Sequence, residues 1–309
     1  MKVVSIINYK GGVGKTTITA NLGTELACRG YRVLLIDADP QCSLTFSFFN
    51  PSDQFKWFEV KELTLKTFFD SLIKPIPNPK SFGDVRVKVS KINKKIQEQG
   101  GKGSLHLIAS HLELINIDMK LAGILAGGIG RHEQAERYFN CFSSISKGLE
   151  KLKSSYDFVL IDCPPNFNIV TKTSIAASNY ILIPSRPDHL STLGISYLKE
   201  SVMEFVEEYN YDTKQANISA IDPKIIGVVF TMVKVNNGQP INAHQRYMGN
   251  VVKEQKLKIF DAFIRENQTT FAIAPEKGIP VVLSASSSSN IVQELKELVD
   301  EFEYLINLD

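Results

Sequence analysis

The sequence predicts an α/β fold, in which a mostly parallel, twisted sheet carries helices on both faces, and a single domain that spans residues 1–309. Short apolar runs, such as Val33 to Ile36, lack polar alternation, which is typical of parallel strands covered on both faces. These runs alternate with longer segments of helical spacing, and that order predicts right-handed crossovers between parallel strands. At 309 residues and 43% hydrophobic, the chain is long and apolar enough to bury a sizeable core.

The first strand, turn and helix predict a phosphate-binding loop of the P-loop NTPase type. An apolar run at residues 3–7 precedes the stretch N-Y-K-G-G-V-G-K-T-T at residues 8–17, and helical spacing continues to about Gly30. Backbone N–H groups in such a turn point at an anion, and the helix dipole adds partial positive charge. Lys15 suits the β- and γ-phosphates of a nucleotide, and the Thr16 hydroxyl suits Mg²⁺.

This loop departs from the strict pattern G-x-x-x-x-G-K-[ST] at its first position. The first glycine of that pattern would fall at Tyr9. Instead, Gly11 and Gly12 lie closer to Gly14, and an additional lysine, Lys10, precedes them.

Two later apolar runs end in carboxylates. Residues 33–36 lead into Asp37 and Asp39 of D-A-D-P-Q, and residues 156–161 lead into Asp162 of D-C-P-P. An α/β sheet places its ligand at the carboxyl ends of the strands, so we expect Asp37 and Asp39 to approach Mg²⁺ and the γ-phosphate. Asp162 has the position of a Walker B aspartate that holds Mg²⁺. The structural alternative is that an aspartate at a strand end only caps a turn.

The string K-G-G-V-G-K-T-T at residues 10–17 resembles the deviant Walker A box of the ParA/MinD family of dimeric ATPases. D-x-D-P-Q and D-x-P-P resemble the switch I and switch II motifs of that family, and the likeness is to its ParA/Soj-type partitioning ATPases in particular. The resemblance covers most of the chain except about residues 50–103. It implies that Lys10 reaches the nucleotide of a partner subunit, that Lys15 acts within its own subunit, and that Asp39 is associated with the attacking water.

The resemblance also implies the cofactors ATP and Mg²⁺ and a set of site residues. The catalytic residues that it implies are Lys10, Lys15 and Asp39, and the metal contacts are Thr16 and Asp162. Contacts to the nucleotide are expected from Lys10, Gly11, Gly12, Val13, Gly14, Lys15, Thr16 and Thr17, and around the adenine from Thr231, Met232 and Pro275. Thr231 and Met232 end a predicted strand at 225–232, and Pro275 lies in a predicted loop at 274–280.

The segment at about residues 50–103 is expected to be a basic, irregular insertion. Between Lys74 and Lys102 it has eight basic residues against Asp84 and Glu98, and three prolines interrupt a short helical pattern. Such a segment is either solvated surface or a contact for DNA or a partner. Trp57 is expected to pack the insertion onto the domain. Beyond it we predict a strand at 104–110, a helix at about 131–152, a strand at 180–184 and a helix at 192–209.

Two features near the C-terminus bear on the binding partner. Basic residues gather between positions 246 and 265, namely Arg246, Lys253, Lys256, Lys258 and Arg265. By the resemblance they are candidates for sequence-independent DNA binding through phosphate contacts; the alternative is a solvated helix face. The predicted helix at 290–309 is amphipathic with an acidic polar face, which anionic lipid would repel, so we expect it to pack onto the sheet.

The function that these observations predict is an ATPase (ATP and water to ADP and phosphate) that dimerises on binding ATP. The resemblance implies slow hydrolysis, stimulation by a ParB-like partner, non-specific DNA binding by the dimer, and positioning of plasmid, chromosome or other cargo. The alternatives are a MinD-like membrane-associated ATPase and an ATP-dependent metabolic synthase on the same scaffold. Four scattered cysteines and the lack of an apolar run of about 18 residues predict a cytoplasmic protein without a transmembrane helix. The resemblance implies that it is associated with the nucleoid and has no membrane partner.

Overall fold

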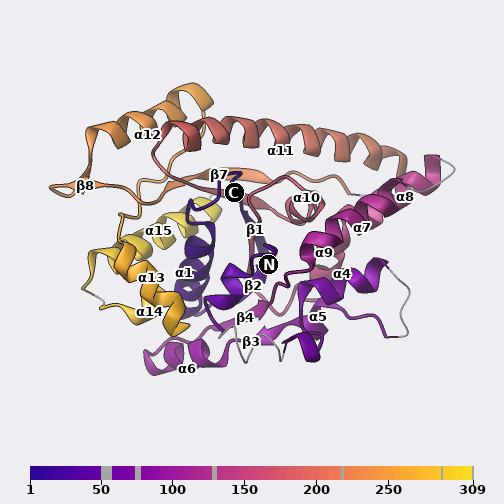
Figure 1. Cartoon of the computed structure of the whole chain (residues 1–309), viewed down its shortest axis with the longest axis horizontal. Helices are drawn as coiled ribbons and strands as arrows, with labels where there is room; N and C mark the ends of the chain where they lie inside the picture. Colours follow the sequence, from indigo (N-terminus) through magenta and orange to yellow (C-terminus); the bar gives the residue numbers. More distant parts are fainter. Residues whose placement is uncertain (50–57, 74–77, 127–130, 217–218, 287, 308–309) are drawn as a thin grey trace.

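The computed structural model describes residues 1–49, 58–73, 78–126, 131–216, 219–286 and 288–307. A seven-stranded sheet forms its middle layer, with the strand order β3-β4-β2-β5-β1-β6-β7. The strands are β1 (Lys2–Ile6), β2 (Arg32–Asp37), β3 (Val87–Lys88), β4 (Ser104–Ile108), β5 (Phe158–Asp162), β6 (Tyr180–Ser185) and β7 (Lys224–Phe230). In Figure 1 the sheet runs from β3 at the bottom to β7 at the top. All pairs are parallel except β3 with β4, which confirms the predicted fold class.

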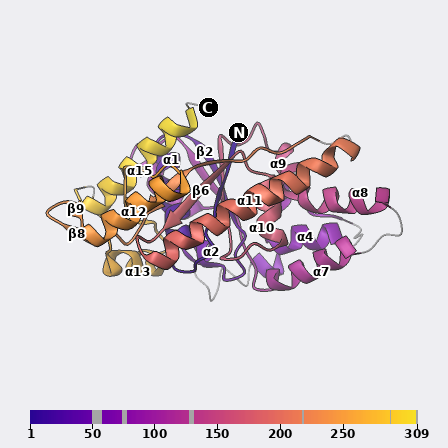
Figure 2. The ribbon, with the colours of Figure 1, turned by 90° about the horizontal axis from the view of Figure 1, so that it is seen from above.

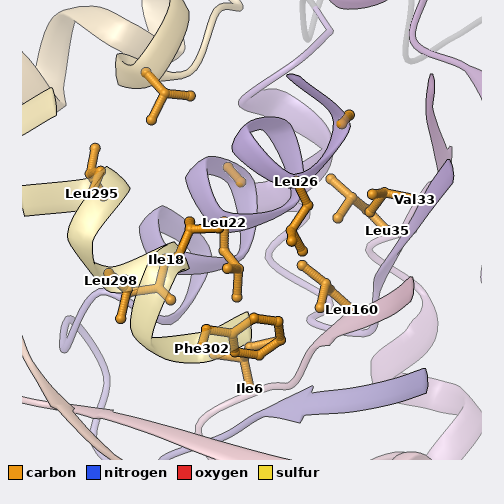
Figure 3. Close-up of a cluster of buried hydrophobic side chains, with 14 of the residues drawn as sticks. Ile6, Ile18, Leu22, Leu26, Val33, Leu35, Leu160, Leu295, Leu298 and Phe302 are labelled. Atoms are coloured by element: carbon orange, nitrogen blue, oxygen red, sulfur yellow. The ribbon is translucent and has the colours of Figure 1, made fainter. Parts of the chain in front are cut away.

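Helices cover both faces of the sheet. One face carries α1 (Lys15–Cys28), α2 (Ser43–Phe46), α6 (Ser90–Glu98), α13 (Gln268–Lys277), α14 (Val281–Ser284) and α15 (Asn290–Asn307). Figure 3 shows how Ile18 and Leu22 of α1 meet Leu298 and Phe302 of α15 above the strands. Because every one of these side chains is almost fully buried, α1 is held between the sheet and the last helix.

The opposite face carries a larger set of helices. They are α4 (Leu65–Ile73), α5 (Phe82–Val85), α7 (Leu114–Ala126), α8 (Arg131–Phe142), α9 (Ser144–Glu150), α10 (Ile169–Ala176), α11 (His189–Ala216) and α12 (Asn242–Gln255). Figures 1 and 2 show α11 crossing the molecule beside α12, and α4, α7, α8 and α9 gathered together at one side. A short hairpin, β8 (Val235–Asn236) and β9 (Gln239–Pro240), precedes α12.

The strand register brings the predicted carboxylates to one edge of the sheet. Asp162 at the end of β5 pairs in register with Asp37 of β2 on one side and with Ile6 of β1 on the other. Since β1 leads directly into the glycine-rich turn, the topology alone sets that turn beside the ends of β2 and β5. This edge is where the site forms.

We predicted one continuous helix at 131–152, and this prediction is wrong. The structure has two helices, α8 and α9, which are separated at Ser143. The Ser143 hydroxyl donates to the carbonyl of Phe139, and its backbone leaves helical geometry with φ −87° and ψ 3°. A serine hydroxyl that bonds the preceding turn competes with the helix ladder, which accounts for the break.

The segment at 50–103 is more regular, where the structure describes it, than the sequence predicts. It contributes α4, α5 and α6, and β3 extends the main sheet. Ser81 begins α5 with a capping box that it forms with Asp84, a local signal that sequence reasoning overlooked. The expected packing of Trp57 lies outside the described residues.

The C-terminal helix packs onto the domain as predicted. The apolar stripe of α15 is buried against α1 and the sheet, while Asp300 and Glu303 on its polar face bind Arg29. Lys2 Nζ also donates to the carbonyl of Ile306 at 2.6 Å, which ties β1 to the end of α15. Among the described helices, none has the length and apolar character needed to cross a bilayer.

Candidate functional site

The loop between β1 and α1 has a backbone shape that glycine makes possible. Gly12 and Gly14 have φ of +69° and +84°, in the left-handed region that side chains disfavour. At Gly14 a Cβ atom would also come within 3.3 Å of the Thr231 side chain. Asn8, which is fully buried, holds the start of the loop by accepting from the N–H of Lys10 at 2.9 Å and donating to the Pro184 carbonyl at 2.8 Å.

Lys15 lies folded back over this loop as the first residue of α1. Its side chain is buried, and Nζ donates to the carbonyls of Asn8 and Lys10, at 3.2 Å in each case. Burial lowers the pKa of Lys15, whereas the nearby charges of Asp162 and Asp39 oppose this shift. Two neutral carbonyls leave the ammonium charge uncompensated in a buried place, so the position favours an anion.

Thr16 and Asp162 form a direct pair between α1 and β5. The Thr16 hydroxyl donates to Asp162 Oδ2 at 2.7 Å, and Thr19 Oγ1 lies 3.4 Å from Asp162 Oδ1. Burial raises the pKa of Asp162 to about 7, against the lowering effects of the Thr16 hydrogen bond and of Lys15. A bound cation would favour the ionised carboxylate.

Asp37 and Asp39 have different roles in the structure. Asp37 is fully buried and accepts from the N–H and the hydroxyl of Thr45, at 2.7 and 2.6 Å, so it anchors α2. It also pairs in register with Asp162 across the sheet. Burial, followed by the charge of Asp162, raises the pKa of Asp37 well above its ordinary value. Asp39 is half-buried and accepts from the N–H of Gln41 at 2.9 Å. Its backbone carbonyl accepts from Ser110 Oγ at 2.6 Å, which links this turn to the segment after β4.

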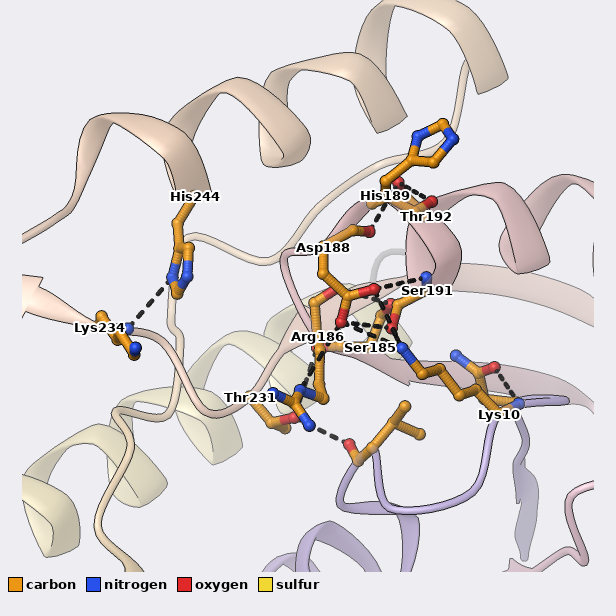
Figure 4. A network of polar contacts seen from close by, with 12 residues as sticks. Lys10, Ser185, Arg186, Asp188, His189, Ser191, Thr192, Thr231, Lys234 and His244 are labelled. Atoms are coloured by element: carbon orange, nitrogen blue, oxygen red, sulfur yellow. Dashed lines mark hydrogen bonds and ion pairs between the residues drawn. The ribbon is translucent and has the colours of Figure 1, made fainter.

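The second lysine of the loop, Lys10, points away from the loop. Figure 4 shows its side chain extended to Asp188 and Ser191 at the start of α11. Nζ lies 3.0 and 3.2 Å from the two carboxylate oxygens of Asp188 and 2.9 Å from Ser191 Oγ. Burial would raise the pKa of Asp188, but hydrogen bonds from the Ser191 N–H and from Lys10 lower it below its ordinary value. The two lysines of the loop therefore have opposite orientations.

A cavity of about 300 Å³ adjoins the loop on the side of α13. Thr231 and Met232, for which we predicted adenine contacts, line this cavity, and the Thr231 hydroxyl donates to the Val13 carbonyl at 2.8 Å. Pro275 does not line it. The predicted loop at 274–280 is wrong in its first part, because α13 continues through Pro275 to Lys277. Pro275 borders a smaller, neighbouring cavity, which shares Thr17 and Phe271 with the larger one.

The basic residues predicted to bind DNA fall into two groups. Arg246 and Lys253 of α12, with Lys256 and Lys258 after it, are exposed. Arg265 differs: it lines the cavity beside the loop, and its Nε lies 2.5 Å from Glu294 Oε1. The structure thus separates Arg265 from the exposed basic group.

Several site residues escaped the sequence analysis. Phe271, Asn267 and Gln268 line the cavity beside the loop, and they come from a stretch without a recognised motif. The Asn267 side chain caps α13 by accepting from the Thr270 N–H at 2.9 Å, and an asparagine before a helical stretch was the available signal. The contacts of Asn8 with Pro184 and of Ser191 with Lys10 join distant parts of the chain, so the local sequence does not specify them.

The donors at this edge fit a nucleoside polyphosphate and a hard cation. The cradle has glycine backbone at the N-terminus of α1, a buried ammonium at Lys15 and an apolar cavity beside it. Thr16 and Asp162 present two oxygen donors, the number and type that Mg²⁺ takes from protein when phosphates and water complete its shell. In the described residues, no cluster of three or more His, Cys, Asp or Glu side chains is placed to hold a metal by itself.

Comparison with known proteins agrees with this geometry. A family model described as AAA domain matches residues 1–215. An uncharacterized protein of Methanocaldococcus jannaschii is 32% identical over 232 residues, which is 74% of this chain and 73% of that protein. The sporulation initiation inhibitor protein Soj of Bacillus subtilis is 26% identical over 91% of this chain and 90% of its own length. The chromosome partitioning protein ParA of Caulobacter vibrioides is 29% identical over 92% and 87%.

Solved structures share the fold at lower identity. Apo McdA of Cyanothece is 22% identical with a TM-score of 0.68, over 97% of this chain and 98% of that chain. Cobyrinic acid a,c-diamide synthase of Mycobacterium smegmatis, with a bound ATP analogue and magnesium, is 22% identical with a TM-score of 0.63, over 90% and 92%. At these identities the likeness shows a common fold.

Proposed function

The chain belongs to the AAA domain family and, within it, to the ParA/Soj type, and we propose that it is a positioning ATPase whose ATP-bound dimer binds DNA without sequence preference. ATP and Mg²⁺ are its cofactors in this proposal. Hydrolysis is slow until a ParB-like partner stimulates it. The cycle of binding and release positions a plasmid, a chromosome or another cargo on the nucleoid.

The opposite orientations of Lys10 and Lys15 carry this proposal. Lys15 folds over its own loop, where it neutralises phosphate charge, while Lys10 is held away from the loop by Asp188. A lysine that does not serve its own cradle is suited to reach the nucleotide of a second subunit. Two nucleotides, each contacted by both subunits, then stabilise a dimer that hydrolysis releases.

The groups of the chain have distinct tasks in the proposed hydrolysis. When bound, Mg²⁺ neutralises charge on the β- and γ-phosphate oxygens. Thr16 and Asp162 hold it, Lys15 binds the same phosphates, and the backbone of residues 10–17 cradles them. Asp39 orients the attacking water. It lies in the turn after β2, which a hydrogen bond from Ser110 links to the segment after β4. Thr231, Met232 and the other residues of the adjoining cavity receive the nucleoside.

Exposed basic residues on and after α12 supply the proposed DNA contact. Arg246, Lys253, Lys256 and Lys258 are exposed together on this part of the chain, so phosphate contacts there need no change in the core. The membrane alternative finds less support, because the apolar stripe of α15 is buried in the domain and its polar face is acidic. The synthase alternative rests on fold likeness alone.

The test is DNA binding by the full chain with ATP and Mg²⁺, with ADP and Mg²⁺, and without nucleotide, each across a salt series. Tight binding only with ATP, with affinity that falls steeply as salt rises and does not depend on sequence, supports the proposal. Molar mass from light scattering should double in the same condition. DNA binding that is indifferent to nucleotide, or turnover that requires a small carboxylic acid, would overturn it.

A further inference from the structure

A second, larger cavity of about 620 Å³ lies among α4, α5, α7, α8 and α9, the helices gathered at the right of Figure 1. It shares no lining residue with the cavity beside the phosphate loop, and the proposed function does not use it. Its volume falls within the range of roughly 300–1,000 Å³ that small-molecule sites occupy. Part of its wall comes from the segment at 50–103, through α4, Lys80, Ser81 and Phe82.

The cavity exists because α8 and α9 present small side chains on one face. Cys141, Ser144 and Gly148 line it at helical spacing, beside the large side chains that fill the core on the neighbouring face. Gly148 leaves space for the Phe82 ring, because a Cβ atom there would come within 2.8 Å of it. Phe68 of α4 packs edge-on against the same ring, with 4.3 Å between centroids. Aromatic rings therefore line one wall of the cavity, and small side chains line the opposite wall.

The charged residues that line the cavity are all basic. They are Lys80, Arg137, Lys147 and Lys151, and no aspartate or glutamate is among the described lining residues. Arg137 pairs with Glu133 at 2.7 Å, and Lys147 donates to Asn140 Oδ1 at 2.9 Å. Arg137, Lys147 and Lys151 share the face of α8 and α9 that carries the small residues. Four cations beside an apolar interior attract a molecule that combines an apolar body with a negative group.

Ser144 adds an unsatisfied polar group to the cavity wall. Its side chain lines the cavity and is 3% exposed, and its hydroxyl has no hydrogen-bond partner among the described residues. A buried hydroxyl without a partner lowers the stability of the folded state, so such groups call for an explanation. A ligand with an acceptor or donor at this depth would satisfy it.

We propose that this cavity binds a small amphipathic anion. Such a molecule, the size of a single lipid chain or a metabolite, has an apolar chain or ring and bears one carboxylate, sulfonate or phosphate group. The apolar body lies against Phe68, Phe82 and Leu121, and the negative group is bound by Lys147 and Lys151 at the basic rim. Ser144 hydrogen-bonds a polar atom of the bound molecule. The site is independent of the nucleotide site and requires no bound ATP.

The experiment uses the fluorescent anion 8-anilinonaphthalene-1-sulfonate as a probe of the full chain, with decanoate, decanol and acetate as competitors. Decanoate should displace the probe at concentrations where its neutral analogue decanol and the short anion acetate do not. ATP with Mg²⁺ should leave the probe in place. Decanoate should also raise the melting temperature of the protein in proportion to its concentration, as a ligand of the folded state does.

Variants locate the site. Lys147→Glu with Lys151→Glu should weaken decanoate binding by about tenfold or more, the loss expected for one charge-assisted hydrogen bond. The matched control is Lys153→Glu, an exposed lysine close by that does not line the cavity, and it should bind as the native chain does. Ser144→Ala should bind the probe several-fold more weakly without lowering the melting temperature of the free protein.

Three outcomes contradict the proposal. They are unchanged decanoate affinity in the double variant with an unchanged melting temperature, displacement of the probe by ATP, and equal competition by decanol and decanoate. The last of these would show an apolar site that the cations do not serve. Binding of an acidic peptide but not of decanoate would equally overturn it, since the site would then belong to a protein partner.

Discussion

Lys10 and Asp188, 178 residues apart in the sequence, are joined by two short contacts of 3.0 and 3.2 Å between the ammonium and the carboxylate. Ser191 Oγ completes the arrangement at 2.9 Å from the same ammonium, and Arg186 Nε approaches the carboxylate at 3.7 Å (Figure 4). The lysine that the proposed function assigns to a partner subunit is thus bound within its own chain. Dimerisation then requires that this contact be exchanged for one with the partner's nucleotide.

This exchange predicts that Asp188→Asn favours the dimer. The pair is about one-third exposed on each side (36% and 38%), so its release accounts for at most about 1 kcal/mol in each subunit. Since the dimer exchanges two such contacts, its dissociation constant should fall by up to about 30-fold. Sedimentation velocity with a slowly hydrolysed ATP analogue measures this constant. Lys10→Ala is the matched control and should lose the dimer while it still binds the nucleotide. A weaker dimer in Asp188→Asn would show that the carboxylate serves the dimer directly.

Lys15→Ala should abolish the nucleotide response of the protein. The ammonium is buried and bonded only to two loop carbonyls among the described residues, so its removal deletes the charge that we propose binds phosphate without breaking an ion pair. We expect nucleotide affinity to fall by roughly 10- to 100-fold, the range for one charge-assisted hydrogen bond. Titration of a fluorescent ATP analogue measures the loss, and an unchanged melting temperature without nucleotide confirms the fold. Retained ATP-driven dimerisation would contradict the phosphate assignment of Lys15.

The parts of the site that the sequence predicted are those in which residue type and local geometry are coupled. Glycines, Lys15 and Thr16 between a strand and a helix, and Asp162 at the end of a buried strand, need only the sheet order to come together. The Lys10–Asp188 contact depends on how α11 packs after β6, and no local pattern encodes it. Asp37 had the same sequence signal as Asp39, yet its carboxylate bonds Thr45 and anchors α2. The break between α8 and α9 follows a local hydrogen bond of Ser143 that the apolar spacing does not reveal, and α13 continues through Pro275 although proline usually ends a helix.

Asp39→Ala should trap the ATP-bound dimer. Asp39 is half-buried at the turn after β2, and among its described contacts the carboxylate accepts only from the Gln41 N–H. Loss of a group that orients water should slow hydrolysis by about 100-fold or more while ATP binding remains. Phosphate release and dimer lifetime are measured together. Asp37→Ala is the comparison variant, and it should lower the melting temperature because it removes both hydrogen bonds to Thr45. Native turnover by Asp39→Ala would place the water elsewhere.

The raised pKa of Asp162 predicts a pH dependence of stability in the absence of Mg²⁺ and nucleotide. Burial raises this pKa to about 7 in the folded chain, against 3.8 as its ordinary value. The folded state therefore binds a proton that the unfolded state has released, so this group lowers the free energy of unfolding as pH rises from about 4 to about 7. The decline is at most about 1.4 kcal/mol for each pH unit in this window. In Asp162→Asn the decline should be smaller, as measured by urea unfolding at several pH values; an equal decline would contradict the assignment.

Charge reversal on and after α12 should separate DNA binding from nucleotide binding. Lys253→Glu with Lys258→Glu removes two exposed cations from the proposed surface and leaves the loop and its cavity untouched. DNA affinity with ATP should fall at every sequence tested, and the slope of log affinity against log salt should decrease by about 1 for each lost phosphate contact. Lys153→Glu, an exposed lysine outside both basic regions, is the matched charge control. Arg265→Gln should instead weaken ATP binding, because Arg265 lines the nucleoside cavity and pairs with Glu294. Two outcomes would show that the DNA-binding surface is not on α12. One is a native dependence of DNA affinity on salt in the double variant, and the other is weaker DNA binding by Arg265→Gln with native ATP affinity.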